Sequence, residues 1–584
     1  MTRLSIQTVL LVLFAMACGV AQEKPTPAEK SNPDPRALGV AAPDTLFKSA
    51  PRDNTARSTQ ALPKFDLPEY VITGVASIDL PDVEKQDGDE PQHVVELANP
   101  LDALRDRLTA EFLSGEKDGL PIVVGSESSG RIRASSGTYF NSKFGLWVSR
   151  LDPDYFFFGD AHYGVSRAYI PFTNRSGGNI NVTGGMTLHG TSERYGGGKL
   201  RGDLGYGSEA YRFYGSSSPG VLRTVSRFGL GATLDSPREL LFSYGARAGL
   251  LVTNIGDSAS SVSETQFHFG GESNLLVGSF PLDGRIDLSL TSIAGSGSGA
   301  LPYLEASLMT PKHWFGGFFV QGSVHLYLTQ GMLSQKLARV YPHVAVGFRV
   351  LENSVASASY LGKVQFNTLS ALVDSHPYLS AASTIRQSDL PLDLILALET
   401  DWNEVWRTRF SARFRTVREY PLFTEGGGGF LVAPLGAPEP KGIWVTGYLG
   451  TTSIASYEAN VFAKFDANSY FTLSLEINSS RNSKTQWDVP YLPDLRIGAG
   501  FSLQVLRGLQ IFPSVVYVGR RVPDLYVASK LKEHARMGLR AEFSALKALG
   551  VFLDFQNATN SRYEEWSGYR AAPLVITAGI GYRW

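Results

Sequence analysis

PLVITAGIGYRW, residues 573–584, alternates apolar side chains with small or polar ones. Every second residue of a β-strand points to the same face, because the side-chain period of a strand is two. One face of this stretch carries Leu574, Ile576, Ala578, Ile580, Tyr582 and Trp584. A fully apolar face that ends in aromatic residues suits lipid better than water. The stretch therefore predicts a strand of a membrane-spanning β-barrel.

The same alternation recurs upstream to about residue 131. Short turns are expected at 152–154, at 466–469 and near Gly508, and longer polar loops at 171–179, 367–390, 426–441 and 482–494. In outer-membrane barrels short turns face the periplasm and long loops face the exterior. We therefore predict an all-β chain in which residues 131–584 form a large antiparallel transmembrane barrel. The expected size is about 22 strands, within a range of roughly 16 to 22 because segments 303–309 and 442–451 are weak.

The composition is compatible with a barrel and excludes other classes. The chain has 584 residues, 60 of them glycine, with 43% hydrophobic and 11% aromatic residues and a formal charge of -1. A helical membrane protein would need runs of about 20 apolar residues, whereas half of each barrel strand can stay polar. The balanced charge gives no reason to expect a nucleic-acid partner.

The N-terminal region has the features of an exported chain. Residues 1–21 combine Arg3 with the apolar run 9–17, which is typical of a signal peptide and too short to span a membrane. Cys18 is the only cysteine, so no intrachain disulfide is possible. It is either removed with the signal or carries a lipid. Residues 22–130 are expected to form a flexible periplasmic arm, because the first part is rich in Pro, Ala, Ser, Thr and charges.

A short helix is expected inside this arm, over residues 100–113. Asn99-Pro100 is a helix-start signal, and Leu101, Leu104, Leu108 and Phe112 share one helical face. Two interpretations remain open for this apolar face. The helix docks on the barrel mouth without further function, or it acts as a short stopper of the lumen.

The sequence resembles TonB-dependent receptors at both ends of its barrel region and in an N-terminal motif. Residues 554–563, followed by Trp566, Gly568-Tyr569, Pro573 and 581–584, resemble the closing hairpin of that family, and 135–139 looks like the start of its barrel. A second motif is similar to the family's TonB box and consists of Leu67, Pro68, Glu69, Tyr70, Val71, Ile72, Thr73 and Gly74. The resemblance implies a segment that adds to a sheet edge of a TonB-like periplasmic protein.

The same resemblance implies further partners and shows one departure. Tyr582 and Trp584 match the family-like signal for the barrel-assembly machinery, and they also suit an aromatic girdle in outer-membrane lipid. Only residues 75–130 separate the box-like motif from the barrel, which is too short for a plug domain with its own core. The sequence thus resembles a receptor whose plug is missing or reduced, and this departure counts against TonB-driven uptake.

One predicted hairpin concentrates charge. Arg407, Arg409, Arg413 and Arg415 share a strand face, and Asp393, Glu399 and Asp401 share a face of the preceding strand. Joined by a tight turn at Trp402-Asn403, both faces point the same way, into the lumen, since charge on the lipid face is unfavourable. The favoured interpretation is a salt-bridge lattice in the wall, and the alternative is an anion-attracting ladder. A second mixed set is expected where His534, Arg536, Arg540 and Glu542 face Asp554 and Gln556.

Catalysis finds little support in the sequence. None of the 9 histidines has metal-ligand spacing, and the glycine-rich run 195–198 is expected to be a turn, not a phosphate-binding loop. No catalytic, cofactor or metal site is therefore predicted. The leading hypothesis is a transporter or receptor that moves a small solute across the outer membrane. The alternative is an anchor or assembly protein whose N-terminal arm binds an envelope partner.

Overall fold

A computed structural model describes residues 127–152, 154–192, 195–236, 242–257, 261–277, 280–295, 298–332, 335–403, 405–425, 442–466, 469–485, 488–523, 530–544, 546 and 548–584. The predicted signal peptide 1–21, the TonB-box-like motif 67–74 and the helix 100–113 lie outside these described residues. The first described strand begins at Glu127, shortly before the position at which the sequence places the start of the barrel.

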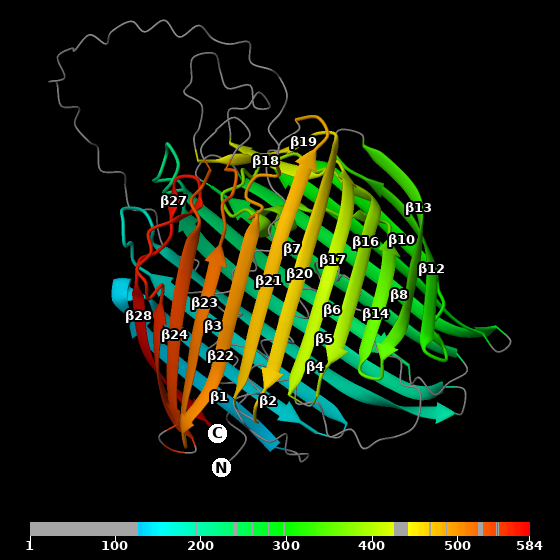
Figure 1. The fold of residues 1–584 in the computed structure, drawn as a ribbon, viewed down its shortest axis with the longest axis horizontal. Coiled ribbons are helices and arrows are strands. Elements are labelled where there is room, and N and C mark those ends of the chain that lie inside the picture. Colours follow the sequence, from blue (N-terminus) through cyan, green and yellow to red (C-terminus); the bar gives the residue numbers. More distant parts are fainter. Residues whose placement is uncertain are drawn as a thin grey trace, which may run out of the picture. The chain divides into compact units, whose positions relative to one another are not determined.

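The described chain forms a closed antiparallel barrel of 22 strands, which confirms the expected fold class and size (Figure 1). The first ten strands follow one another directly: β1 (Glu127–Gly137), β2 (Ser142–Leu151), β3 (Tyr155–Ser166), β4 (Arg175–Ser192), β5 (Tyr195–Arg212), β6 (Leu222–Asp235), β7 (Phe242–Gly256), β8 (Ser261–Val277), β9 (Phe280–Gly295) and β10 (Gly299–Met309). The run 195–198 is thus the start of β5, so its prediction as a turn was wrong. Its backbone pairs with β4, with Tyr195 opposite Ser192 and Gly198 opposite Leu188.

The remaining twelve barrel strands complete the ring. They are β12 (Phe318–Gln330), β13 (Lys336–Leu351), β14 (Ser354–Leu361), β16 (Ser388–Asp401), β17 (Trp406–Arg418), β20 (Thr451–Lys464), β21 (Tyr470–Asn482), β22 (Leu495–Leu506), β23 (Leu509–Val518), β24 (His534–Ser544), β25 (Leu549–Gln556) and β28 (Val575–Arg583). The short segments β11 (His313–Phe315) and β15 (Lys363–Gln365) also pair with this sheet. The weak segment 303–309 is part of β10, whereas β19 (Trp444–Tyr448) pairs only with β18 (Pro421–Glu425) and is not a barrel strand.

The first and last strands close the ring. β1 pairs with β28 in a register that sets Arg131 opposite Arg583. Two backbone hydrogen bonds extend the seam, from Gly130 N to Trp584 O at 3.1 Å and from Trp584 N to Gly130 O at 3.0 Å. A Cβ at Gly130 would lie 2.1 Å from the Trp584 ring, so this position needs glycine. The predicted terminal strand therefore forms one side of the closing seam.

The two ends of the barrel differ in their connections (Figure 1). The turn end holds the C-terminus and is built from tight turns such as Trp402–Val405, where the Asn403 side chain accepts hydrogen bonds from two backbone N–H groups. The loop end, opposite to it, holds 366–387, 557–574 and the described parts of two further connections, 419–425 with 442–443 and 519–523 with 530–533. The first overlaps the predicted loop 367–390, and the predicted loop 426–441 lies outside the described residues. The sequence analysis did not single out the connections at 519–533 and 557–574.

Burial alternates along the strands as the sequence predicts. On β12, Val324, Leu326 and Leu328 are exposed, while Tyr327 and Thr329 are buried. The exposed apolar positions form the outward belt of the barrel, and the others face the lumen. None of the helices in the described ranges is long and apolar enough to cross a membrane.

Candidate functional site

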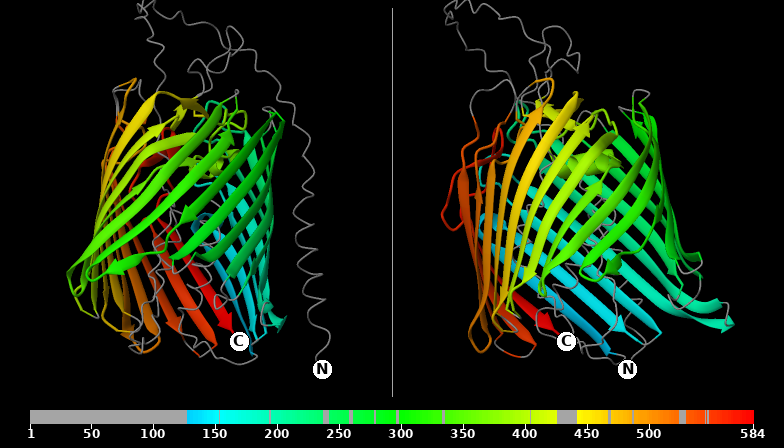
Figure 2. Two further views of the ribbon diagram at one scale, coloured as in Figure 1. Left: turned by 90° about the vertical axis from the view of Figure 1, so that its right-hand side faces the viewer. Right: turned by 45° about the vertical axis from the view of Figure 1, so that its right-hand side comes forward.

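A segment that we call the strap, residues 366–387, leaves β15 at the loop end and returns to the wall at β16. It contains α3 (Leu369–Ser375), which lies within the ring of strands (Figure 2). Thr368 starts this helix because its hydroxyl accepts a hydrogen bond from Ala371 N at 3.2 Å. Leu369, Leu372 and Val373 are buried, so the short helix is stabilised by packing.

Glu264 of β8 fixes the start of α3. Its carboxylate accepts hydrogen bonds from Leu369 N at 2.6 Å and from Ser370 N at 3.3 Å, and the residue is 1% exposed. Its strand neighbours Phe267 and Phe269 are exposed on the opposite face. The carboxylate therefore points into the lumen, and it satisfies two helix N–H groups that have no partner within the helix.

Two residues of β6 and one of β5 fix the rest of the strap. Arg223 is 0% exposed, donates to Leu379 O at 3.0 Å and pairs with Asp257 at 3.2 Å. Arg227 pairs with Asp374 of α3. Tyr211 OH donates to Pro377 O at 2.7 Å. The strap thus joins the β15–β16 side of the wall to the β5–β8 side across the lumen.

Two further loop segments pack on the strap, and together the three form what we call the roof. The first is the β18–β19 hairpin, in which Trp444 N donates to Tyr378 O at 3.2 Å and Trp444 O accepts from Ser380 N at 2.6 Å. The second is the pair β26 (Glu564–Trp566) and β27 (Tyr569–Arg570), in which the Tyr569 ring stacks on Tyr378 with centroids 3.6 Å apart. The core of the roof is continuous with lumen-facing residues of the wall.

His376 lies in the centre of this core. It is 0% exposed, and neither of its ring nitrogens has a hydrogen-bond partner among the residues that the structure describes. Its ring contacts Trp566 at a centroid distance of 3.9 Å and Trp444 at 4.6 Å. Burial lowers the pKa of His376 well below its usual value, so the side chain is neutral. Burial likewise raises the pKa of Tyr378, with Glu565 as a second cause.

Three glycines allow the roof segments to meet backbone to backbone. Gly442 has φ 74°, and a Cβ there would lie 2.6 Å from Gly215 O. A Cβ on Gly215 would lie 2.7 Å from Gly568 O. Tyr569 OH also donates to Gly442 O at 2.6 Å. The junction therefore leaves no room for side chains at these positions.

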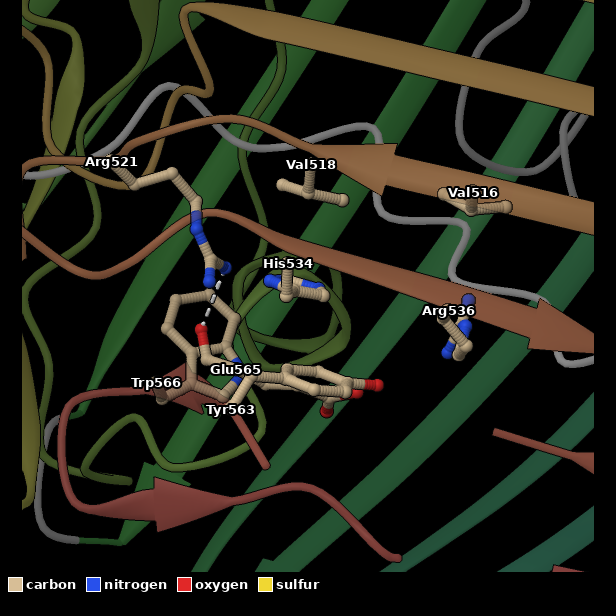
Figure 3. Close-up of a pocket in the computed structure, with 8 residues that line it drawn as sticks. All are labelled: Val516, Val518, Arg521, His534, Arg536, Tyr563, Glu565 and Trp566. Carbon is tan, nitrogen blue, oxygen red and sulfur yellow. Dashed lines mark hydrogen bonds between the residues drawn. The ribbon is translucent and has the colours of Figure 1, made fainter. Parts of the chain in front are cut away.

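A cavity lies beside the roof, where β23 and β24 reach the loop end (Figure 3). Its empty space is about 390 Å³, including the part open to solvent. Arg521 is 3% exposed and donates to Glu565 O at 3.1 Å and to Glu564 O at 2.9 Å. Burial lowers the pKa of Arg521, and Glu565 opposes that shift. The two hydrogen bonds attach the loop 557–574 to the connection between β23 and β24.

The predicted second set of charges divides between this cavity and the wall below. His534 lines the cavity and stacks on Tyr563 at 3.8 Å, and Arg536 lines it as well (Figure 3). Glu542 pairs with Arg540 and, at 3.1 Å, with Arg133 of β1. Asp554 lies opposite Arg540 in the strand register and accepts from Gln556 at 2.9 Å.

The structure brings the predicted charged hairpin together as β16 and β17. Three of its arginines pair across the hairpin: Arg407 with Asp401 at 2.5 Å, Arg409 with Glu399 at 3.3 Å, and Arg413 with Asp393 at 2.6 Å. Arg415 lies opposite Asp393 in the register, yet both Asp393 oxygens accept from Arg413. Whether this set acts as a salt-bridge lattice in the wall or as an anion-attracting ladder is a matter for the proposals on function.

The sequence analysis missed the acid above this set, Asp389. It is buried and accepts from Arg339 at 3.0 Å, from Arg418 at 3.5 Å and from Tyr341 OH. These partners come from β13 and β17, so no spacing along the chain marks them. Within the described ranges, no group of three or more His, Cys, Asp or Glu residues could hold a metal ion.

Three solved structures with the same fold are described as receptors or transporters. The FrpB iron transporter from Neisseria meningitidis matches with a TM-score of 0.61 and 10% identity, over 79% of this chain and 82% of that one. The copper transporter OprC matches with a TM-score of 0.59 and 12% identity, over 78% and 80%. A mutant of the ferric enterobactin receptor PfeA from Pseudomonas aeruginosa matches with a TM-score of 0.60 and 10% identity, over 79% and 81%.

No protein-family model and no curated protein matches the sequence. At these identities the likeness is one of fold. It confirms the predicted resemblance to the barrel of TonB-dependent receptors.

Proposed function

We propose that this protein is an outer-membrane transporter that moves a small solute through its barrel. The observation that carries the proposal is the roof: among the described residues, loop segments held through named contacts cross one end of the lumen of a 22-strand ring. Barrels of this size enclose a wide lumen that something must fill. A barrier made of loops can move without breaking the barrel wall.

The orientation follows from the two ends. Long loops of outer-membrane barrels face the exterior and short turns face the periplasm. The roof would therefore close the outer mouth, and the C-terminus would lie on the periplasmic side. A solute that reaches the lumen must displace the strap, the β18–β19 hairpin or both.

Opening would break a small set of contacts on the lumen side of the wall. Glu264, Arg223 and Arg227 hold the strap from β8 and β6. The buried charged hydrogen bonds of Glu264 and Arg223 each contribute about 1.5–3 kcal/mol. The partly exposed pair Arg227–Asp374 contributes less, about 0–1 kcal/mol, because solvent screens it. A solute that competes for these groups would loosen the strap as it binds, which couples occupancy to opening.

Coupling to a TonB-like partner is the second part of the proposal. The motif 67–74 would add as a strand to the partner's sheet edge, since an extended segment pairs its backbone with an exposed edge. Deleting residues 67–74 then abolishes uptake in cells. Unchanged uptake by the deletion variant would mean that transport is passive or that the box-like motif has no role.

Single-channel conductance of the purified chain in a planar bilayer tests the roof as the barrier. We expect small or no steps for the unaltered chain and larger steps for Glu264→Ala, which leaves two helix N–H groups without their acceptor. The measurement is repeated with and without residues 22–130, because the arm is a second candidate stopper. Asp401→Asn at the turn end is the matched control and leaves the conductance unchanged. Closed channels in every variant would overturn the proposal.

A second candidate function is a membrane anchor or assembly protein. Dense ion pairing of the lumen wall favours it, because a wall held by salt bridges and a closed mouth need not conduct. Recovery of partners with the full chain, compared with a chain lacking residues 22–130, separates the two functions. An assembly or secretion component that depends on the arm supports the anchor, and an energy-transducing protein supports transport.

A further inference from the structure

The upper part of the β13–β17 wall holds more basic than acidic side chains. Lumen-side basic groups there are Arg339, Lys363, Arg413, Arg415 and Arg418, and the acids paired with them are Asp389 and Asp393. Asp389 serves Arg339, Arg418 and Tyr341, while Asp393 serves Arg413 through both oxygens. Both acids are almost fully buried, at 1% and 0% exposure. Both carboxylates are therefore already bonded to residues of the wall.

Two basic groups are left over. Arg415 has no ion pair among the described residues, and its buried Nε has no hydrogen-bond partner. Lys363 is likewise without an ion pair in the described part of the chain, and it lies within electrostatic range of Asp393, which already pairs with Arg413, and of Arg413 and Arg415. An unpaired guanidinium beside like charges is costly to keep in a partly buried site. Such a group is expected to have a partner that is not part of the wall.

Other acids of the wall, Glu305 and Glu476, lie within electrostatic range of Lys363 or Arg415 but form no ion pair with them among the described residues. Glu305 is engaged by His325 at 3.0 Å and by Tyr303 OH at 2.7 Å. Glu476 accepts from Asn478 at 2.9 Å. Glu458 of β20 lies opposite Ser411, toward the turn end from Arg415 in the strand register. The positive excess around Arg415 is thus local.

We propose that Arg415 and Lys363, beneath the strap, form a binding site for an oxyanion, that is, a carboxylate or phosphate group of the transported solute. The guanidinium supplies a planar fork for two oxygens, and the ammonium supplies a point charge. The bond from Arg413 to Asp393 joins β17 to β16 next to Arg415. The proposal rests on the proposed transport function and names the class of its substrate.

Isothermal titration calorimetry of the full chain tests the site with two probes, citrate and inorganic phosphate, and with glucose as a neutral probe. Titrations are run at low ionic strength and repeated at high salt, since salt screens such a site. Both the unaltered chain and Glu264→Ala are used, so that a closed roof does not hide the site. We expect binding of citrate or phosphate, no binding of glucose, and weaker binding at high salt. Preference for citrate identifies a carboxylate solute, and preference for phosphate a phosphorylated one.

The decisive comparison is between matched variants. Arg415→Gln and Lys363→Gln each weaken anion binding about tenfold, which corresponds to the loss of one charged hydrogen bond. Arg407→Gln, on the same strand but in an exposed pair at the turn end, leaves it unchanged. Glu458→Gln removes an acid nearby and tightens binding slightly. Equal affinities in all these variants, or no binding in either background, would overturn the site. Conductance of Glu264→Ala still reports separately on transport.

Discussion

The loop end and the turn end of the barrel are built from the same strands but are held together differently. At the loop end, Arg223, Trp444 and His376 are at most 1% exposed and join segments from distant parts of the wall. At the turn end, Arg407 and Asp401 are 53% and 57% exposed and join only neighbouring strands. Buried contacts between distant segments hold loops across the lumen. Exposed contacts between adjacent strands add little beyond the strand pairing itself. The barrier of the proposed transport function therefore lies at the loop end.

The largest expected effect comes from Trp444→Ala. Removing this 1% exposed ring leaves a cavity in the roof core and costs about 3–5 kcal/mol of local stability. Hydrogen exchange followed by mass spectrometry should show faster exchange in the strap and in β18–β19. Trp406→Ala at the turn end, where the ring is 38% exposed, is the control and should change little. Equal effects of both substitutions would erase the contrast between the ends.

A somewhat smaller effect is expected from Gly442→Ala. The residue has φ 74°, and the new methyl group would meet the backbone of Gly215 and Ser216. Strain and overpacking together cost about 1–3 kcal/mol. The substitution should separate the β18–β19 hairpin from the loop 213–221 and raise the conductance. Gly316→Ala tests strain alone, because that glycine also has positive φ but no atom within 4 Å of the added Cβ.

The roof should also weaken in acid. The folded-state pKa of His376 is lowered, so the unfolded roof binds a proton that the folded roof does not. Stability is therefore complete above the unfolded value of about 6.5 and falls below it by up to about 1.4 kcal/mol per pH unit. Hydrogen exchange of the strap across this range measures the slope. His376→Phe should flatten it, and an unchanged slope in that variant would assign the pH dependence to other groups.

The smallest effect is expected at the turn end. Asp401→Asn removes an exposed ion pair with Arg407, which is worth about 0–1 kcal/mol. Thermal unfolding should shift little, and less still at high salt. A large loss of stability would show that the exposed pairs carry more of the wall than their exposure suggests.

The sequence predicted the barrel because strand alternation is local. Leu326 is exposed and the adjacent Tyr327 is buried, because successive side chains of a strand point to opposite faces. The pairing of Arg407 with Asp401 was predictable for the same reason, since one tight turn joins their strands. The number of strands followed once each segment was recognised.

The roof was not predictable from such patterns. α3 is a seven-residue helix with no amphipathic period long enough to recognise, and its capping partner Glu264 lies on a strand far upstream. Segment 442–451 was a weak strand candidate for the wall, and it became β19 because its partner is β18, not β17. Asp389 was missed because its partners Arg339 and Arg418 come from different strands. Contacts between distant segments leave no spacing in the sequence.

The seam between Gly130 and Trp584 has a consequence for how the protein folds. Until the last strand is in place, β1 and β25 are open edges whose backbone groups lack partners, and open edges pair with other chains. Joining the two ends of so long a segment also carries a large entropic cost that is recovered only when the ring closes. Ring closure is thus the step of longest range and the slowest by topology. A chain without Trp584 would lose the indole that lies against Gly130 and both backbone hydrogen bonds between these two residues, and we expect slower closure of its ring.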